Sequence, residues 1–584
     1  MEKRVLIAVI LSFIVLYAYQ VMFPPPKPAS GSGAGSQKTS ASPSASSTVT
    51  STVPPTGTAV DATRQSAEAT PPSSSPASPV VADTTERDIP FESPSVSAVF
   101  TTRGGVLKSW RLKKYQDAAK QPLELIPRTV PAGTPRPFSV SVGDQASDAT
   151  LASALFKPST DRIDLASGQS TLTFEYTDAS GLSAKKEFVF TADQPYAIDF
   201  SATVQRSGKS VQPTIQWGPG IGSGVAAGSS SYDQASQPIF YRDGSVSRIS
   251  PNKVAENAVQ DGVLPFAGVD DHYFLTATLP GPQPIHVEYR TLDVPLTGET
   301  VAHFVDWSAR YNRTPVKARY FLGPKDFDVL ASVDRDLVRS IHFGMFAWLV
   351  VPLLRALKWV NGYVGNYGWS IIILTILINI AMFPLRHKSV VSMRKMQEIQ
   401  PQVKAIQDRY ANLKMTDPAK QKMNTELMSL YREAGVNPAS GCVPMLLTFP
   451  VLLAFYSMLS VAIELRGAPF IGWIHDLSIR DPLYITPVLM GITQFIQTKM
   501  TPTTGDAMQQ RMMLLMPIIM MSWLLFMPSG LVVYWTTSNL WAIGQQALTN
   551  KLIGPMKPRT ARPPAERKMK NVGGGRTEAV KERK

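Results

Sequence analysis

The sequence predicts two structurally different halves, an all-β sandwich domain and a polytopic α-helical membrane domain with six transmembrane helices. The chain has 584 residues, of which 44% are apolar, so it is long enough to hold both. Only Met1 and Met22 precede residue 345, whereas the other twenty of the 22 methionines follow from that point. Methionine fills apolar packing gaps or contacts many apolar partners, so its distribution marks the boundary between the two halves.

The N-terminal apolar run, residues 5–23, follows Lys3 and Arg4 and is long enough to cross a bilayer as a helix. It ends in large side chains and lacks a small-x-small cleavage site, which favours an uncleaved anchor over a signal peptide. Residues 24–90 are mostly Pro, Ser, Ala, Thr and Gly, a composition that cannot bury enough apolar surface to fold. We expect a transmembrane anchor at 1–23, with a cytoplasmic N-terminus, and a disordered tether at 24–90.

Residues 91–325 alternate between apolar and polar residues in short runs such as TLTFEYT (171–177), with Gly and Pro turns between them. A period of two predicts antiparallel strands in a sandwich. The loop GPGIGSG at 218–224 lacks the Lys-Ser/Thr pair of a phosphate-binding loop, so we expect a plain strand connection. His272 follows two aspartates, but no serine or cysteine motif accompanies it, and a structural cluster is expected there.

Residues 326–366 are expected to form a linker and an amphipathic helix. The run FGMFAWLVVPLLRALKWV (343–360) carries Arg355 and Lys358 on one side and tryptophans towards its ends. A membrane-spanning helix would not place those charges in lipid. We therefore predict a helix that lies in the outer membrane interface, with its aromatic rings at headgroup depth.

Apolar runs predict the six crossings, which are residues 5–23, 367–385, 443–464, 483–499, 512–527 and 531–548. The fourth and fifth are short against a hydrocarbon core of about 30 Å, so they are expected to thin the bilayer around them. The last five form a core at 367–550. An even number of crossings places the basic tail, residues 551–584, in the cytoplasm, where its charge also fits. Such a tail would attract anionic lipid or RNA, although control of topology is the commoner role.

The second crossing, YGWSIIILTILINIAMFPL, holds Thr375 and Asn379 one helical turn apart, so both polar groups lie on one face. That face must point away from lipid. One interpretation is that Asn379 makes a hydrogen bond between helices. The other is a hydrated interior that handles other polypeptide chains.

Residues 386–440 hold ten Lys/Arg against five Asp/Glu, which places the segment in the cytoplasm. Apolar residues recur every three or four positions on either side of Asp417-Pro418, so two antiparallel helices are predicted. The faces of this hairpin include Met393, Met396, Tyr410 and Tyr431. The segment is either a self-contained coiled hairpin or an arm that meets arriving polypeptides or ribosomal RNA.

Enzymatic chemistry has little support in the sequence. The single cysteine, Cys442, excludes an internal disulfide and a cysteine metal cluster, and the six histidines form no metal or hydrolase motif. We expect no catalytic residues, no metal and no cofactor. A transporter would show inverted repeats or paired intramembrane charges, and neither is visible.

Several strings resemble the YidC-type (YidC/Oxa/Alb) membrane protein insertases. They are VGNYGWSIIILT (364–375), NPASGCVPMLLTFPVLLAFYSML (437–459) and MPSGLVVYWTTSNL (527–540). The likeness is specific over residues 345–550 and weaker in the β domain, where TTRGGVL (101–107) is the best match. The resemblance implies the type of insertase found in bacteria with two membranes. Such a protein is located in the inner membrane and carries a periplasmic supersandwich domain.

The resemblance further implies a five-helix core around a hydrophilic groove that opens to the cytoplasm and to lipid. Its implied partners are nascent membrane proteins, the Sec translocon, membrane lipids and, through the basic tail and the hairpin, the ribosome. The groove and substrate-contacting residues that it implies are Thr375, Asn379, Thr448, Tyr534, Trp535, Ser538 and Asn539.

One position departs from the family pattern. Most members have an arginine in the groove five residues before the proline of the second crossing, where this chain has Asn379. Arg386 and Lys388, one to two turns beyond the proline, are candidates to supply charge at the groove mouth instead. The expected activity is insertion driven by the burial of apolar segments, without a nucleotide. The alternatives are a polytopic transporter and a chaperone that assists membrane assembly without insertion.

Overall fold

The computed structural model describes residues 78–117, 119–127, 130–131, 133–221, 234–295, 301–410, 418–435, 443–501 and 507–553. The predicted anchor, all but the end of the predicted tether and nearly all of the predicted basic tail lie outside these ranges. The described residues comprise a β region from Pro79 to Pro324 and a helical region after it.

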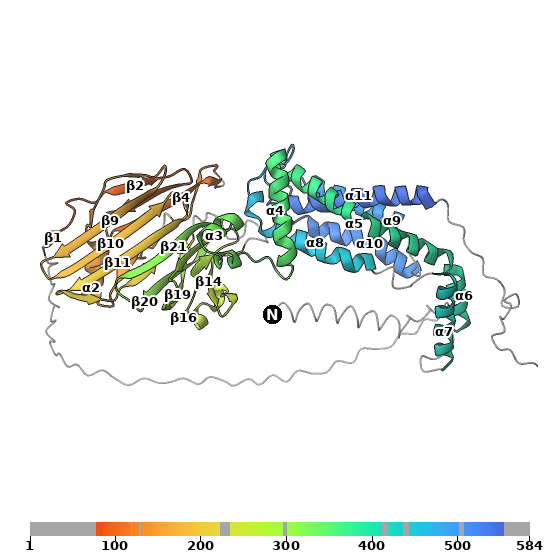
Figure 1. Cartoon of the computed structure of the whole chain (residues 1–584), viewed down its shortest axis with the longest axis horizontal. Coiled ribbons are helices and arrows are strands. Elements are labelled where there is room, and N and C mark those ends of the chain that lie inside the picture. The colour runs from red at the N-terminus through yellow and green to blue at the C-terminus, as the bar shows by residue number, and fades with distance from the viewer. Residues whose placement is uncertain are drawn as a thin grey trace, which may run out of the picture. The chain divides into compact units, whose positions relative to one another are not determined.

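The β region is built on one large sheet of eleven strands (Figure 1). Its central order is β1-β9-β10-β11-β21-β18-β17-β14-β15, with β7 paired to β9 and β12 to β11. The strands are β1 (Pro79–Val81), β7 (Lys157–Pro158), β9 (Gln169–Asp178), β10 (Leu182–Thr191), β11 (Ala197–Arg206), β12 (Lys209–Val211), β14 (Gln237–Arg242), β15 (Ser245–Arg248), β17 (Ala267–Asp270), β18 (Phe274–Leu279) and β21 (Val316–Pro324).

Two smaller sheets of five strands complete the region. One contains β16 (Val259–Val263), β19 (Pro284–Pro295), β20 (Val301–Tyr311), β13 (Thr214–Trp217) and β6 (Ser139–Ser141), in that order. The other contains β5 (Pro122–Glu124), β4 (Val106–Gln116), β3 (Val96–Thr101), β2 (Asp88–Glu92) and β8 (Ile163–Asp164). Pairing is antiparallel throughout the described strands except between β2 and β8. Strands β1 and β2 begin N-terminal to residue 91, where the sequence placed the start of the domain.

Aromatic side chains join the large sheet to both smaller ones. Phe91 on β2 packs against Phe190 on β10 with ring centroids 4.4 Å apart. Trp217 and Trp307, from the other small sheet, stack against Tyr320 on β21. Inward-facing positions alternate with half-exposed ones along β9, β10 and β11, which is the pattern that the sequence predicted. The β-sandwich prediction is therefore confirmed.

A buried lysine lies inside this sandwich. Lys186 on β10 has only 2% of its surface exposed, and its ammonium donates to the carbonyl oxygens of Gly104, Gly105 and Phe138 at 2.6, 3.3 and 2.8 Å. Burial lowers the pKa of Lys186 to about 7, because an apolar environment disfavours the charged form. The three carbonyl oxygens are the groups that make a charged lysine tolerable at this position.

The helices are α2 (Gln145–Ser153), α3 (Phe327–Val333), α4 (Ala347–Val364), α5 (Tyr367–Glu398), α6 (Gln400–Arg409), α7 (Pro418–Glu433), α8 (Val443–Val461), α9 (Ile485–Met500), α10 (Ala507–Leu524) and α11 (Ser529–Ile553). Helix α11 packs against α5 and α9, α10 packs against α9, and α4 packs against α5 and α8 (Figure 1). Within the described residues, 3₁₀ turns occur at Pro251–Lys253, Ala255–Asn257, Leu337–Ser340 and Ile463–Leu465.

Lys358 on the predicted interfacial helix, α4, lies among three carboxylates. Its ammonium is 3.2 Å from Asp326, 2.7 Å from Asp328 and 2.8 Å from Glu464. Burial lowers the pKa of Lys358, but the nearby carboxylates outweigh that effect and leave the pKa above its ordinary value. This cluster fixes α4 to the start of α3 and to the turn that follows α8.

The number of membrane crossings is not confirmed. Within the described ranges, α5 is the one helix that is long and apolar enough to cross a membrane by length and composition. Shorter apolar stretches occur at Phe449–Val461 and Met512–Leu524. Helix α9 has 16 residues, about 24 Å, which is shorter than a typical hydrocarbon core. The six-helix count therefore remains an expectation, and the first predicted crossing lies outside the described residues.

Helix α5 continues through Pro384 to Glu398. The sequence predicted instead that the crossing ends at residue 385 and that the hairpin begins directly after it. Its 32 residues span about 48 Å, so its last turns extend beyond the length of a crossing. Helices α6 and α7 then pack side by side around Ile399, Val403, Ile406 and Leu430, with Arg409 paired to Glu426 (Figure 1).

The loop between α8 and α9 covers the N-terminal ends of α5 and α11. Phe470 packs on Gly368 so closely that an added Cβ would lie 2.0 Å from its ring. Ser529, the first residue of α11, donates its hydroxyl to the carbonyl oxygen of Ile479 at 2.6 Å. Asp481 is fully buried and accepts from the Trp473 indole and from main-chain N–H groups. This end of the bundle is closed by packed loop residues.

Candidate substrate groove

The predicted polar face of α5 is buried inside the bundle. Thr375 donates its hydroxyl to the carbonyl oxygen of Ile371 at 2.6 Å, and Asn379 donates its amide N–H to the carbonyl oxygen of Thr375 at 2.8 Å. Asn379 has 4% of its surface exposed. Both side chains therefore point away from lipid, as their polarity requires, and each donates a hydrogen bond to a carbonyl oxygen of its own helix.

Arg386 returns along α5 towards Asn379. Its Nη1 atom donates to Oδ1 of Asn379 at 2.7 Å, although the two residues are two helical turns apart. The guanidinium is mostly enclosed by the protein, and no carboxylate contacts it among the residues that the structure describes. Lys388 is exposed instead. Of the two expected groove-mouth charges, Arg386 lies beside the predicted groove residues and Lys388 does not.

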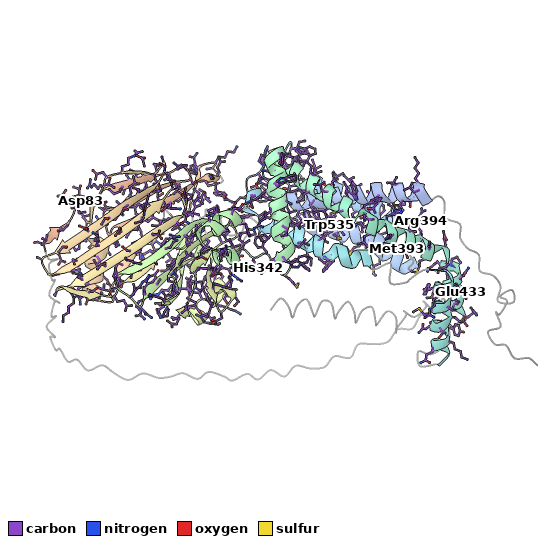
Figure 2. All side chains as sticks on the ribbon, viewed as in Figure 1. Asp83, His342, Met393, Arg394, Glu433 and Trp535 are labelled. Carbon is purple, nitrogen blue, oxygen red and sulfur yellow. The ribbon has the colours of Figure 1, made fainter. Side chains whose placement is uncertain are left out.

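Helix α11 lies opposite this polar face of α5. The Tyr534 ring stacks on Phe455 of α8 with centroids 4.4 Å apart, and its hydroxyl lies near Ser538 and Arg386. Trp535 is half-buried on the same helix and is labelled in Figure 2. A polar seam between α5 and α11 is thus formed by Asn379, Arg386, Tyr534 and Ser538.

Asn539, another predicted groove residue, does not join that group. Asn539 points to α9, where its amide donates to the Thr493 hydroxyl at 3.4 Å. It links two helices within the bundle, and sequence reasoning missed its partner. The side chain of Thr448 lies outside the described residues, although its backbone belongs to α8.

A second polar group joins the C-terminal halves of α5 and α11. The Arg394 guanidinium donates to the Asn550 side chain at 2.8 Å, and Gln546 donates to the same oxygen at 2.9 Å. His387 lies 3.4 Å from the Thr549 hydroxyl. These residues were not among those predicted from the sequence. The spacing of polar residues at three and four positions along α11 was the available signal.

The four hairpin residues divide between two places. Met393 and Met396 lie on the last turns of α5 (Met393 in Figure 2), not on the hairpin helix where they were expected. This follows from the unbroken course of α5 through Pro384. Tyr410 follows α6 and donates its hydroxyl to Glu426 of α7 at 2.9 Å, and Tyr431 packs against the small core of the hairpin.

Metal ligation has no support in the described parts of the chain, where no group of three or more His, Cys, Asp or Glu side chains is suited to hold an ion. His272, beside the two aspartates, contacts the carbonyl oxygen of Ser460 at 2.7 Å. This contact gives it a structural position next to the end of α8.

The described residues combine a folded β sandwich with an apolar helical bundle that holds a buried polar seam, an arrangement that fits a membrane protein with a large domain outside the bilayer. Residues 88–356 match the family described as YidC periplasmic domain, and residues 359–556 match the 60Kd inner membrane protein family. The "Membrane protein insertase YidC" of Syntrophus aciditrophicus is 34% identical over 94% of this chain and 100% of that protein. That of Pelobacter propionicus is 35% identical over 95% of this chain and 100% of its own length.

The chain therefore belongs to the YidC family, whose members are inner membrane proteins with a periplasmic domain. A solved structure, described as an active YidC insertase with the first transmembrane domain resolved, covers 81% of this chain and 95% of its own. It has 17% sequence identity and a TM-score of 0.32.

Proposed function

We propose that this protein inserts newly made membrane proteins into the bilayer and helps them to fold, alone or together with the Sec translocon. The observation that carries the proposal is the enclosed guanidinium of Arg386, hydrogen-bonded to Asn379 and without a carboxylate partner among the described residues. A charge held between apolar helices costs free energy, so such residues in membrane proteins are usually functional. Near-full-length similarity to proteins named as insertases supports the same activity.

The proposed route is a partition of the substrate between two environments. Its polar terminus or loop enters the seam between α5 and α11, where Arg386, Tyr534 and Ser538 replace part of its hydration. Its apolar segment meanwhile moves into lipid along the bundle. Burial of about twenty apolar residues supplies the driving force, so no nucleotide is needed.

Arg386 takes the place of the charge that most family members carry at the position of Asn379. Because Arg386 reaches back over two turns, the guanidinium lies beside Asn379 although the residue itself lies beyond Pro384. A positive charge here attracts acidic residues of a translocated segment. The loop that closes the N-terminal end of the bundle supports entry from the cytoplasmic end.

The proposed topology keeps six crossings, with both termini in the cytoplasm and the β domain in the periplasm. The basic C-terminal tail and the hairpin of α6 and α7 are then on the side where ribosomes deliver substrates. Contact with anionic lipids and with ribosomal RNA follows from their charge. A transporter is not favoured, because the relatives are named as insertases.

The test is insertion of a single-span protein with an acidic N-terminal segment into proteoliposomes that contain the purified chain, scored by protection from protease. Arg386→Leu is expected to lower insertion about tenfold or more, since hydrogen bonds to charged groups contribute about 1.5–3 kcal/mol. Lys388→Leu is the matched control, because that lysine is exposed on the same turn of α5. Full activity of both Arg386→Leu and Asn379→Leu would contradict a role for this seam.

A further inference from the structure

Helix α11 carries a polar stripe on the face that it turns towards α5. Its members recur every three or four residues and are Tyr534, Ser538, Trp541 and Gln545. Contacts at both ends place the stripe against α5. The Tyr534 hydroxyl lies near Arg386, and Thr549, one turn beyond the stripe, contacts His387.

The second half of the stripe is unsatisfied. Gln545 has 7% of its surface exposed, and neither its Nε2 nor its Oε1 atom has a hydrogen-bond partner among the described residues. The indole Nε1 of Trp541, one turn earlier, is buried without a partner in the same described part of the chain. The adjacent Gln546 is equally buried, but it donates to Asn550 at 2.9 Å.

Unpaired buried groups of this kind are costly. Each lost hydrogen bond of a buried donor or acceptor costs about 1–3 kcal/mol, and most buried polar groups in native proteins have a partner. This cost weakens the packing of α5 against α11 when nothing occupies the seam. A molecule that supplies the missing donors and acceptors recovers that free energy when it enters.

The unpaired groups define the chemistry of that molecule. The Gln545 amide requires one acceptor and one donor side by side, and the Trp541 indole requires an acceptor. Along one edge of an extended polypeptide, a residue presents its N–H and its C=O together, and the pair repeats every second residue, about 6.6 Å. Four residues of helix separate Trp541 from Gln545, a rise of about 6 Å. The two spacings agree.

We propose that Trp541 and Gln545 form a main-chain binding site for an extended segment of the substrate polypeptide in the seam between α5 and α11. The inference rests on the proposed insertase function and names the part of the substrate that this seam recognises. Every residue except proline offers the same N–H and C=O, so the site accepts polar segments of unrelated sequence. Arg386, by contrast, selects for charge.

The experiment uses the full chain in nanodiscs and a synthetic peptide with a six-residue Gly-Ser terminus before a twenty-residue Leu-Ala span. A second peptide carries esters in place of the main-chain amides of the terminus, which removes N–H donors and weakens the carbonyl acceptors. We expect the wild-type protein to bind the amide peptide about five- to tenfold more tightly, which corresponds to about one net hydrogen bond. Gln545→Leu should abolish that preference, and Gln546→Leu should retain it.

Thermal unfolding supplies an independent readout. Gln545→Leu removes an unpaired amide and is expected to leave the Tm unchanged or raise it, whereas Gln546→Leu breaks a hydrogen bond and is expected to lower it. Equal binding of amide and ester peptides by the wild-type protein, or an amide preference that persists in Gln545→Leu, would overturn the proposal. A Tm loss in Gln545→Leu as large as that in Gln546→Leu would do the same.

The two proposals fail in different ways. If the wild-type chain does not insert the amide peptide into proteoliposomes, the insertase function itself is contradicted. If it inserts both peptides equally well and binds them equally, insertion stands and the main-chain site does not.

Discussion

Replacement of Lys186 by methionine tests how the β domain tolerates a charge in its core. Lys186 is fully enclosed and donates to three carbonyl oxygens, and burial lowers its pKa to about 7 from an ordinary value of 10.5. Methionine keeps nearly the same length without a titratable group. The variant should therefore change how stability depends on pH, beyond any change in stability itself.

The sign of the pH effect follows from the two pKa values. Below about pH 7 the lysine is protonated in the folded and unfolded states, and the full cost of the buried charge is present. Between about pH 7 and 10.5 the folded state releases its proton while the unfolded state keeps it, so the free energy of unfolding rises with pH. The rise is at most about 1.4 kcal/mol per pH unit, or about 2 kcal/mol between pH 7 and 9.

The assay is pulse proteolysis of the full chain in urea at pH 7 and pH 9, with subtilisin and with mass spectrometry of fragments from residues 78–325. The wild-type β domain should gain stability at pH 9, and Lys186→Met should lose that gain. Lys185→Met is the matched control, because Lys185 is exposed and pairs with Glu175 at 2.7 Å. The same pH dependence in Lys186→Met and in the wild type would refute the reasoning.

Two further predictions concern packing between elements. Lys358→Met should lower the free energy of unfolding of the full chain by about 3–5 kcal/mol, because it leaves the carboxylate of Glu464, whose side chain is 7% exposed, without its lysine partner. A second change, Glu464→Gln, should restore most of that loss, and additive losses would show that the pair is not coupled. Gly268→Ala should destabilise the β domain by about 1–3 kcal/mol, because the added Cβ would lie 2.0 Å from the Thr276 carbonyl oxygen on the paired strand β18. The same proteolysis assay measures the loss, and a variant as stable as the wild type would contradict that packing.

Local sequence pattern identified the β sandwich well. Alternation along β9, β10 and β11 depends only on which face of a strand meets the core, and that period is visible in any window of the sequence. The course of α5 was less predictable. Pro384 removes a single hydrogen bond, and helices that lie in a bundle tolerate such a loss when neighbours pack against them. The sequence therefore placed Met393 and Met396 on the wrong helix.

The candidate site shows the same division. The sequence alone determined that Thr375, Asn379 and Ser538 must avoid lipid, because the cost of exposing polar groups to hydrocarbon is a property of each residue and its position on a helix. Only the tertiary structure decided what they meet. Arg386 reaches Asn379, Asn539 turns to Thr493, and Gln545 is left unpaired beside a paired Gln546. These outcomes depend on the register of α5, α9 and α11 against one another, which long-range packing sets and which no local period records.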